Sequence, residues 1–175
     1  MDYRRAWCQG GTYFFTVNLL KRSGNNLLVE HIDSLKQTIR LVKRNHPFKI
    51  HGCVVLPDHM HCVIELPKND TNFPLRWSLI KAGFSKTLPK IEHISSVRKR
   101  RGERGIWQRR YWEHLIRDEK DYQAHMDYVH INPVKHGLVK QVADWPHSTF
   151  HKLVDDGVYP LNWVGGDEES LSYMD

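Results

Sequence analysis

Two short apolar runs separated by a two-residue turn constrain the fold of this chain most strongly. The first run covers residues 50–56, and the second begins at His59 or His61 and ends at Leu66, with Pro57-Asp58 between them. Runs of this length, rich in β-branched residues and bounded by proline and aspartate, favour β-strands. Strands joined by so short a connection pair antiparallel. We therefore expect both runs to belong to an antiparallel sheet.

The rest of the chain adds two predicted strands and three predicted helices. Asp118 is expected to be the N-cap of the last helix, which should end near Ile131 because Pro133 follows. The order of the elements predicts an α/β (α+β) fold, in which helices pack on one side of an antiparallel sheet. The predicted strands are 12–19, 50–56, 59–66 and 113–116, the predicted helices are 33–45, 74–88 and 118–131, and residues 91–105 are predicted to form a loop.

The composition fits one compact domain without a membrane span. The chain has 175 residues, of which 40% are hydrophobic, enough to bury a core. No run approaches the roughly 18 apolar residues that cross a bilayer, and no secretory signal opens the sequence. Cys8, Cys53 and Cys62 show no C-x-x-C spacing, so neither a disulfide framework nor a zinc ribbon is expected. Cys53 and Cys62 should be core residues of neighbouring strands. A reducing, cytoplasmic location is expected.

Positive charge is concentrated in one segment. The net charge is +6, and lysines and arginines crowd residues 98–110 beside Trp107, Tyr111 and Trp112. Cations neutralise phosphates and aromatic rings stack on bases, so this composition favours a nucleic-acid strand as the partner. A solvated loop with surface ion pairs is the alternative. The residues predicted to contact nucleic acid are Arg4, Arg5, Arg98, Lys99, Arg100, Arg101, Arg109 and Arg110.

The sharpest local feature is His59-Met60-His61 at the start of an apolar strand. Side chains alternate along a strand, so both imidazoles point to one face while Met60 points to the other. Two imidazoles on one face can hold a metal ion. The alternative is a pair of ordinary surface or turn histidines, because His-x-His also occurs by chance.

A polar stripe runs along the predicted helix that begins after Asp118. Asp121, His125, Tyr128 and Asn132 follow one another at helical spacing, beside an apolar stripe of Tyr122, Met126 and Val129. A Tyr and an Asn four residues apart project together, so both could reach one metal site. The alternative is that the stripe marks the boundary between the buried and solvated faces of the helix. Tyr111 and Tyr122 are the competing tyrosines.

Three separated motifs resemble those of bacterial transposases associated with repetitive extragenic palindromes (REP). These are HUH single-strand DNA transposases, in which a hydrophobic residue separates two histidines. The resemblance covers residues 3–163, nearly the whole chain. It is carried by residues 56–61 (LPDHMH), 107–112 (WQRRYW) and 128–135 (YVHINPVK).

The resemblance implies a fold like that of RNA-recognition motifs and ferredoxins, and a metal-dependent tyrosine transposase. By motif position His59 and His61 match metal-binding histidines, Asn132 occupies the place of a third ligand, and Tyr128 matches the nucleophile. It further implies Mg²⁺ or Mn²⁺ as cofactor, single-stranded and hairpin DNA as partner, and a 5′-phosphotyrosine intermediate. The protein is expected to act on the nucleoid, as a monomer or a homodimer.

Two other functions and one regulatory hypothesis stay open at this level. A non-catalytic hairpin-DNA-binding regulator would use the same surface, and a zinc hydrolase would use His-x-His without Tyr128. Residues 1–164 are predicted to form the transposase domain and residues 165–175 a flexible acidic tail. We hypothesise that the tail folds over the basic surface and competes with DNA; a merely solubilising terminus is the alternative.

Overall fold

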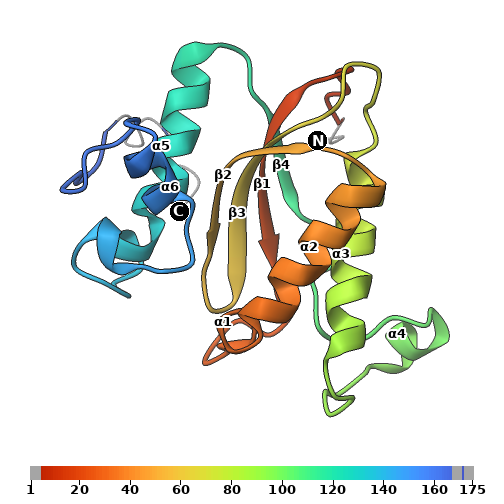
Figure 1. Cartoon of the computed structure of the whole chain (residues 1–175). Helices are drawn as coiled ribbons and strands as arrows, with labels where there is room; N and C mark the ends of the chain where they lie inside the picture. The colour runs from red at the N-terminus through yellow and green to blue at the C-terminus, as the bar shows by residue number, and fades with distance from the viewer. Residues whose placement is uncertain (1–4, 167–170, 172–175) are drawn as a thin grey trace.

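The computed structural model describes residues 5–166 and Leu171, and a four-stranded antiparallel sheet lies at its centre (Figure 1). The sheet has the spatial order β2-β3-β1-β4, and every adjacent pair is antiparallel. This confirms the sheet predicted from the sequence, including the β2–β3 pair joined at Pro57-Asp58. The strands are β1 (Thr12–Asn18), β2 (Lys49–Val55), β3 (His59–Glu65) and β4 (Trp112–Leu115).

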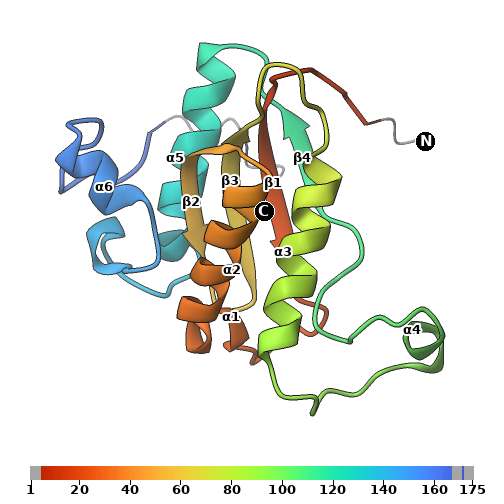
Figure 2. The same ribbon diagram turned by 45° about the vertical axis from the view of Figure 1, so that its right-hand side comes forward.

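Helices cover both faces of the sheet, so the prediction that they share one face is wrong in this detail. Helices α2 (Ile32–Asn45) and α3 (Phe73–Thr87) cover one face, and α5 (Glu119–Lys135) covers the other (Figures 1 and 2). The strands explain the arrangement. In β1, Phe15 belongs to the core beneath α2 and α3, whereas Phe14 belongs to the core beneath α5. Because both faces are apolar, both must be covered.

Helix α5 lies close to β2 because β2 carries a glycine at the contact. A Cβ atom added to Gly52 would lie 2.8 Å from Met126 Sδ and 3.2 Å from His130 Cε1. The pairing of β2 with β3 is also irregular between Ile50 and Gly52, as at a β-bulge. A side chain at this position would therefore force the Met126 and His130 side chains to shift.

Helix α5 continues through Pro133 to Lys135, beyond the predicted end at Ile131. A proline removes one helical hydrogen bond, but the chain here is held in other ways. Ile131 is buried against the short helices η1 (Val142–Asp144) and α6 (Phe150–Asp155), and Asn132 and Pro133 are buried as well. Burial of this last turn outweighs the cost of the proline.

The predicted loop at residues 91–105 contains a short helix, α4 (Ser96–Arg100), whose N-cap Ser95 accepts a hydrogen bond from Arg98 N. Helices α1 (Leu27–Glu30), η1 and α6 were likewise not predicted, since they are too short for a periodic pattern.

Leu171 is buried beneath α5, and the charged residues of the predicted tail, 167–169 and 175, lie outside the described residues. Within the described part of the chain no helix is long and apolar enough to cross a membrane.

Candidate metal and nucleophile site

His59 and His61 both point to the α5 face of the sheet, as the alternation of β3 predicts. Met60, between them, is buried in the core beneath α2 and α3. His59 is 4% exposed and His61 is 3% exposed, so neither is an ordinary surface histidine. Their ring centroids lie 4.9 Å apart.

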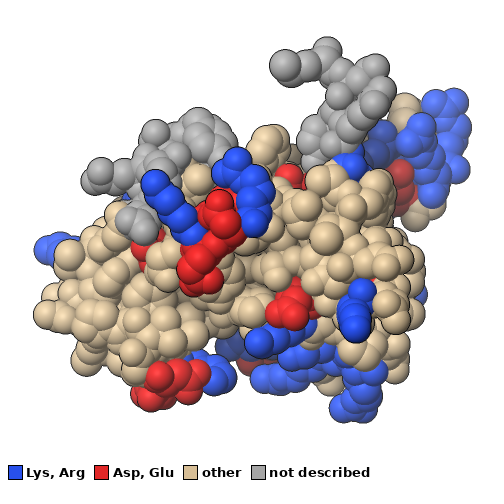
Figure 3. Space-filling view, turned by 90° about the horizontal axis from the view of Figure 1, so that it is seen from above, with Lys and Arg blue, Asp and Glu red and all other residues tan. Residues whose placement is uncertain are grey.

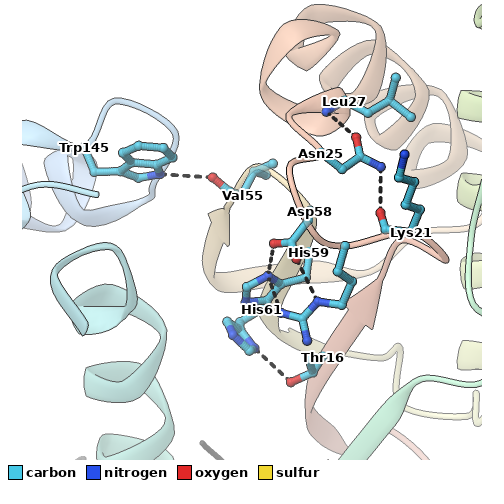
Figure 4. Close-up of polar contacts among 10 residues, drawn as sticks. Thr16, Lys21, Asn25, Leu27, Val55, Asp58, His59, His61 and Trp145 are labelled. Atoms are coloured by element: carbon cyan, nitrogen blue, oxygen red, sulfur yellow. Dashed lines mark hydrogen bonds and ion pairs between the residues drawn. The ribbon is translucent and has the colours of Figure 1, made fainter. Parts of the chain in front are cut away.

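The Nδ1 atom of each imidazole is occupied by a neighbouring polar group, as Figure 4 shows. His59 Nδ1 lies 2.6 Å from Asp58 Oδ1, and His61 Nδ1 lies 2.8 Å from Thr16 Oγ1. Metal-binding histidines are oriented in this manner, with one ring nitrogen fixed by a hydrogen bond so that the other faces the ion. His61 Nε2 is buried and has no hydrogen-bond partner of good geometry in the described part of the chain. These two rings therefore fit a divalent ion.

Helix α5 brings Tyr128 and Asn132 to the same place. The ring of Tyr128 lies 5.3 Å from that of His61, at a steep angle of 74°. The Asn132 side chain interacts with His61, and its Nδ2 donates to the carbonyl oxygen of Tyr128 at 2.6 Å. With its nitrogen engaged, the Asn132 amide can present its oxygen as a third metal ligand. The four residues predicted for the site thus lie together.

Burial sets the protonation state of the site. It lowers the pKa of His61 well below its usual value. Burial also lowers the pKa of His59, although Asp58 opposes the shift. For Asp58, burial raises the pKa, but hydrogen bonds with His59 and Arg22 outweigh burial and hold the pKa below its usual value. At neutral pH the imidazoles are therefore neutral, with lone pairs available to a cation, and Asp58 is a carboxylate.

The competing tyrosines lie elsewhere. Tyr111 packs against Phe15 and Trp77 on the opposite face of the sheet, and burial raises its pKa to about 12. The Tyr122 hydroxyl lies 3.0 Å from His51 Nδ1 at the β2 edge. Of these three tyrosines, only Tyr128 makes a ring contact, edge to face, with a histidine of the His59–His61 pair.

Of the residues predicted to contact nucleic acid, some are exposed to solvent and others are held by contacts within the protein. Arg4 lies outside the described residues, and Arg5 forms an ion pair with Glu113 at 3.1 Å. The Arg98 side chain is only 12% exposed and donates to Arg104 O, so it holds the α4 loop together. Five others are exposed: Lys99, Arg100, Arg101, Arg109 and Arg110, of which Arg109 pairs with Glu103 at 2.8 Å.

A groove of about 800 Å³ lies between α3 and residues 90–111, and it is rich in basic side chains. Lys81, Lys86 and Lys90 line it together with Lys99 and Arg109. Seen from above, lysines and arginines gather mainly on one half of the molecule, with carboxylates among them (Figure 3). Positive charge is therefore unevenly distributed over this surface, although several of the arginines form ion pairs with glutamates.

Several residues of the site were not predicted. Arg22 donates to Asp58 Oδ2 at 2.7 Å and lies 3.2 Å from His59 Nδ1, and the His136 ring lies 5.1 Å from that of His59. Trp112 is 48% exposed and pairs with Thr16 across the strands, which places it on the same face as His61. Asp58, adjacent to His59, and Trp112, an aromatic residue beside the basic segment, carried a usable sequence signal, whereas Arg22 and His136 did not.

Comparisons with known proteins place the chain in a family. No protein-family model matches it. A protein of Escherichia coli described as a REP-associated tyrosine transposase is 49% identical over 164 residues, 94% of this chain and 91% of the relative. A Haemophilus influenzae relative under the same family name is 42% identical, covering 95% of both chains.

A solved structure, described as the REP-associated tyrosine transposase bound to a REP hairpin, matches with a TM-score of 0.82 and 47% identity. It covers 95% of this chain and 93% of that one. Identity at this level over nearly the full length of both proteins shows that the chain belongs to the REP-associated tyrosine transposases.

Proposed function

We propose that this protein is a metal-dependent endonuclease and strand transferase that cleaves and rejoins single-stranded or hairpin DNA. Tyr128 is the nucleophile, and His59, His61 and Asn132 hold Mg²⁺ or Mn²⁺. The observation that carries the proposal is the position of the Tyr128 ring, 5.3 Å from that of His61, whose buried Nε2 has no well-formed hydrogen bond within the described residues. In this proposal the nucleophile and a metal-ligating nitrogen share one side of the sheet, as the positions of Tyr128 and His61 allow.

The proposed reaction is a transesterification. A divalent ion bound at the site would polarise a phosphoryl oxygen and neutralise developing charge. Tyr128 Oη attacks the phosphorus, the P–O3′ bond breaks, the phenol loses its proton, and the 3′ oxygen gains one. The 5′-phosphotyrosine bond conserves the phosphodiester energy, so attack by a 3′-hydroxyl rejoins DNA without ATP.

The surroundings of Tyr128 favour loss of its proton in the transition state. An ordinary tyrosine has a pKa of about 10 and is a poor nucleophile at neutral pH. Lys135 Nζ lies 5.2 Å from the centre of the Tyr128 ring, a cation–π contact, and we propose that its positive charge assists loss of the phenol proton. The His61 ring packs edge to face against the Tyr128 ring and helps to fix the orientation of the tyrosine.

For the substrate we propose a REP-like hairpin with a single-stranded foot. This rests on the relative whose structure holds a REP hairpin, and on the exposed cations of residues 99–110. The half-exposed Trp112 shares the face of the site and offers a ring on which a base can stack. We propose a cytoplasmic, nucleoid-associated protein that acts as a monomer or homodimer through residues 1–164.

The test is cleavage of a labelled hairpin oligonucleotide in Mn²⁺, with and without a chelator, by the wild type and by Tyr128→Phe. The proposal expects metal-dependent cleavage by the wild type alone. Binding without cleavage under every metal condition would favour a DNA-binding regulator. Hydrolysis by Tyr128→Phe would favour a zinc hydrolase that uses the two histidines without the tyrosine.

A further inference from the structure

A second group of metal-ligating side chains lies where β4 meets α5. His114 comes from β4, and Asp121 and His125 come from the first two turns of α5. One ligand atom from each lies within 4.8 Å of the others, and Asp121 and His125 are buried. This group is distinct from the His59–His61 site.

His125 has a nitrogen that lacks a partner. Its Nδ1 lies 2.8 Å from the Asp121 carbonyl oxygen, which can only accept, so Nδ1 carries the proton and Nε2 carries a lone pair. His125 is fully buried, and its Nε2 has no hydrogen-bond partner within the described residues. His130 provides a contrast, since its Nδ1 also meets a carbonyl oxygen but its Nε2 lies 2.7 Å from Thr149 Oγ1. A buried imidazole nitrogen without a donor is a ready metal ligand.

Asp121 supplies a charged oxygen beside the same imidazole ring, on its Nδ1 side. Its Oδ2 lies 2.8 Å from His114 Nε2 and accepts hydrogen bonds from Arg117 N and Nε, whereas Oδ1 lies 3.2 Å from His125 Nδ1. Burial raises the Asp121 pKa, but the bonds from Arg117 and His114 outweigh it and bring the pKa to about 2. The carboxylate is therefore ionised at neutral pH. Burial lowers the pKa of His125, which keeps that imidazole neutral.

We infer that His114, Asp121 and His125 form a second divalent-cation site, of the two-imidazole, one-carboxylate type that suits Zn²⁺. The His114 ring is partly exposed and stacks on His125 with 4.5 Å between ring centroids, so to ligate the ion it would turn out of this stack, and the Nε2 proton would leave to solvent. The ion ties β4 to the start of α5, the helix that carries Tyr128. Its role is to fix that helix on the sheet, and it does not depend on the proposed DNA chemistry.

Arg117 is the group that opposes a cation here. Its guanidinium approaches Asp121 Oδ2 at 3.1 Å, yet the side chain is 72% exposed. An exposed arginine can move aside, and its removal eliminates a competing charge. Arg117→Ala should therefore tighten Zn²⁺ binding, a gain that a purely structural histidine–aspartate pair would not produce.

The test measures Zn²⁺ stoichiometry by calorimetry, and Co²⁺ absorption as a spectroscopic probe, in full-length protein freed of metal. In a His59→Ala/His61→Ala background, one equivalent should still bind. Adding His114→Ala should weaken that binding at least tenfold, whereas adding the control His51→Gln, another partly buried imidazole, should leave it unchanged. In the same His59→Ala/His61→Ala background, Zn²⁺ should raise the melting temperature only where the second site is intact.

No binding in the His59→Ala/His61→Ala background, with circular dichroism showing a folded chain, would overturn the inference. So would one equivalent that persists unchanged in His114→Ala. If the double variant does not fold, the wild type decides, since it should bind two equivalents and Arg117→Ala should tighten one of them. A single equivalent unaffected by Arg117→Ala and His114→Ala would contradict the second site. Failure of DNA cleavage would leave these measurements unchanged.

Discussion

The ring centroids of His61 and Tyr128 lie 5.3 Å apart, although the two residues are 67 positions apart along the chain. His61 lies on β3 and Tyr128 on α5, and the two elements meet because α5 covers the face to which His61 points. Phe14 of β1 fills the space beside both, at 5.7 Å from His61 and 5.8 Å from Tyr128 between ring centroids. The apolar core beneath α5 therefore also positions the reacting groups.

Asp58→Asn should weaken metal binding and cleavage without removing a ligand. The carboxylate fixes the His59 ring through Nδ1 at 2.6 Å, and loss of such an orienting partner typically lowers metal affinity about 10- to 100-fold. Calorimetric titration with Mn²⁺ measures the change. Asp156→Asn, which alters an exposed carboxylate paired with Lys152, is the matched control. Equal affinities in the two variants would show that Asp58 does not orient His59.

His59→Ala and His61→Ala should each abolish metal-dependent cleavage while DNA binding stays within a few-fold. Each change removes one imidazole from the ion and leaves the exposed cations in place. Gel-based cleavage assays and fluorescence anisotropy separate the two effects, with His51→Ala as a control on the neighbouring strand. Full activity of the wild type in excess chelator would refute a metal mechanism.

DNA binding should weaken steeply with salt, and Lys99, Arg100 and Arg101 should account for part of the slope. For single strands the logarithmic slope is about −0.7 per phosphate contacted. Replacing these three by Ala should flatten the slope, because all three are exposed. Arg98→Ala should instead loosen the α4 loop, since Arg98 bonds Arg104 O. An unchanged slope in the triple variant would mean that this segment does not contact the phosphates.

The metal-free protein should lose stability as the pH falls below 6.5. Burial lowers the pKa of His130 to about 4, whereas in the unfolded chain the pKa returns to about 6.5. Between these values the unfolded chain binds a proton that the folded chain excludes, so stability decreases with falling pH, by up to about 1.4 kcal/mol per pH unit. Urea unfolding between pH 7 and pH 5 measures this, and His130→Gln should reduce the slope. A pH-independent free energy of unfolding would contradict the buried neutral state.

The sequence predicted the parts of the fold that repeat with a clear period. All four strands and the three long helices were expected, because alternation and helical spacing leave a direct signal. The placement of α5 alone on one face was not predicted. Phe14 and Phe15 are the same residue type and are adjacent in sequence, and only the assembled sheet shows that they belong to cores on opposite faces. Pro133 misled the prediction of the helix end, because the burial that stabilises the last turn comes from residues 142–155, far along the chain.

The site was predicted less completely than the fold. His59, His61, Tyr128 and Asn132 could be named because they belong to contiguous motifs. Thr16 and Arg22 could not, because they reach the histidines through strand register and a loop that returns to Asp58. Contacts of that kind depend on the assembled sheet, which no local spacing reveals.

The most direct test of the central claim is identification of the residue that becomes covalently linked to DNA. A hairpin oligonucleotide labelled at its 3′ end is incubated with the protein and Mn²⁺, the adduct is digested with protease, and the modified peptide is sequenced by mass spectrometry. The account predicts one adduct, through the 5′-phosphate on Tyr128, absent in chelator and in Tyr128→Phe. An adduct on Tyr111 or Tyr122, or cleavage that releases a free 5′-phosphate without any adduct, would contradict it.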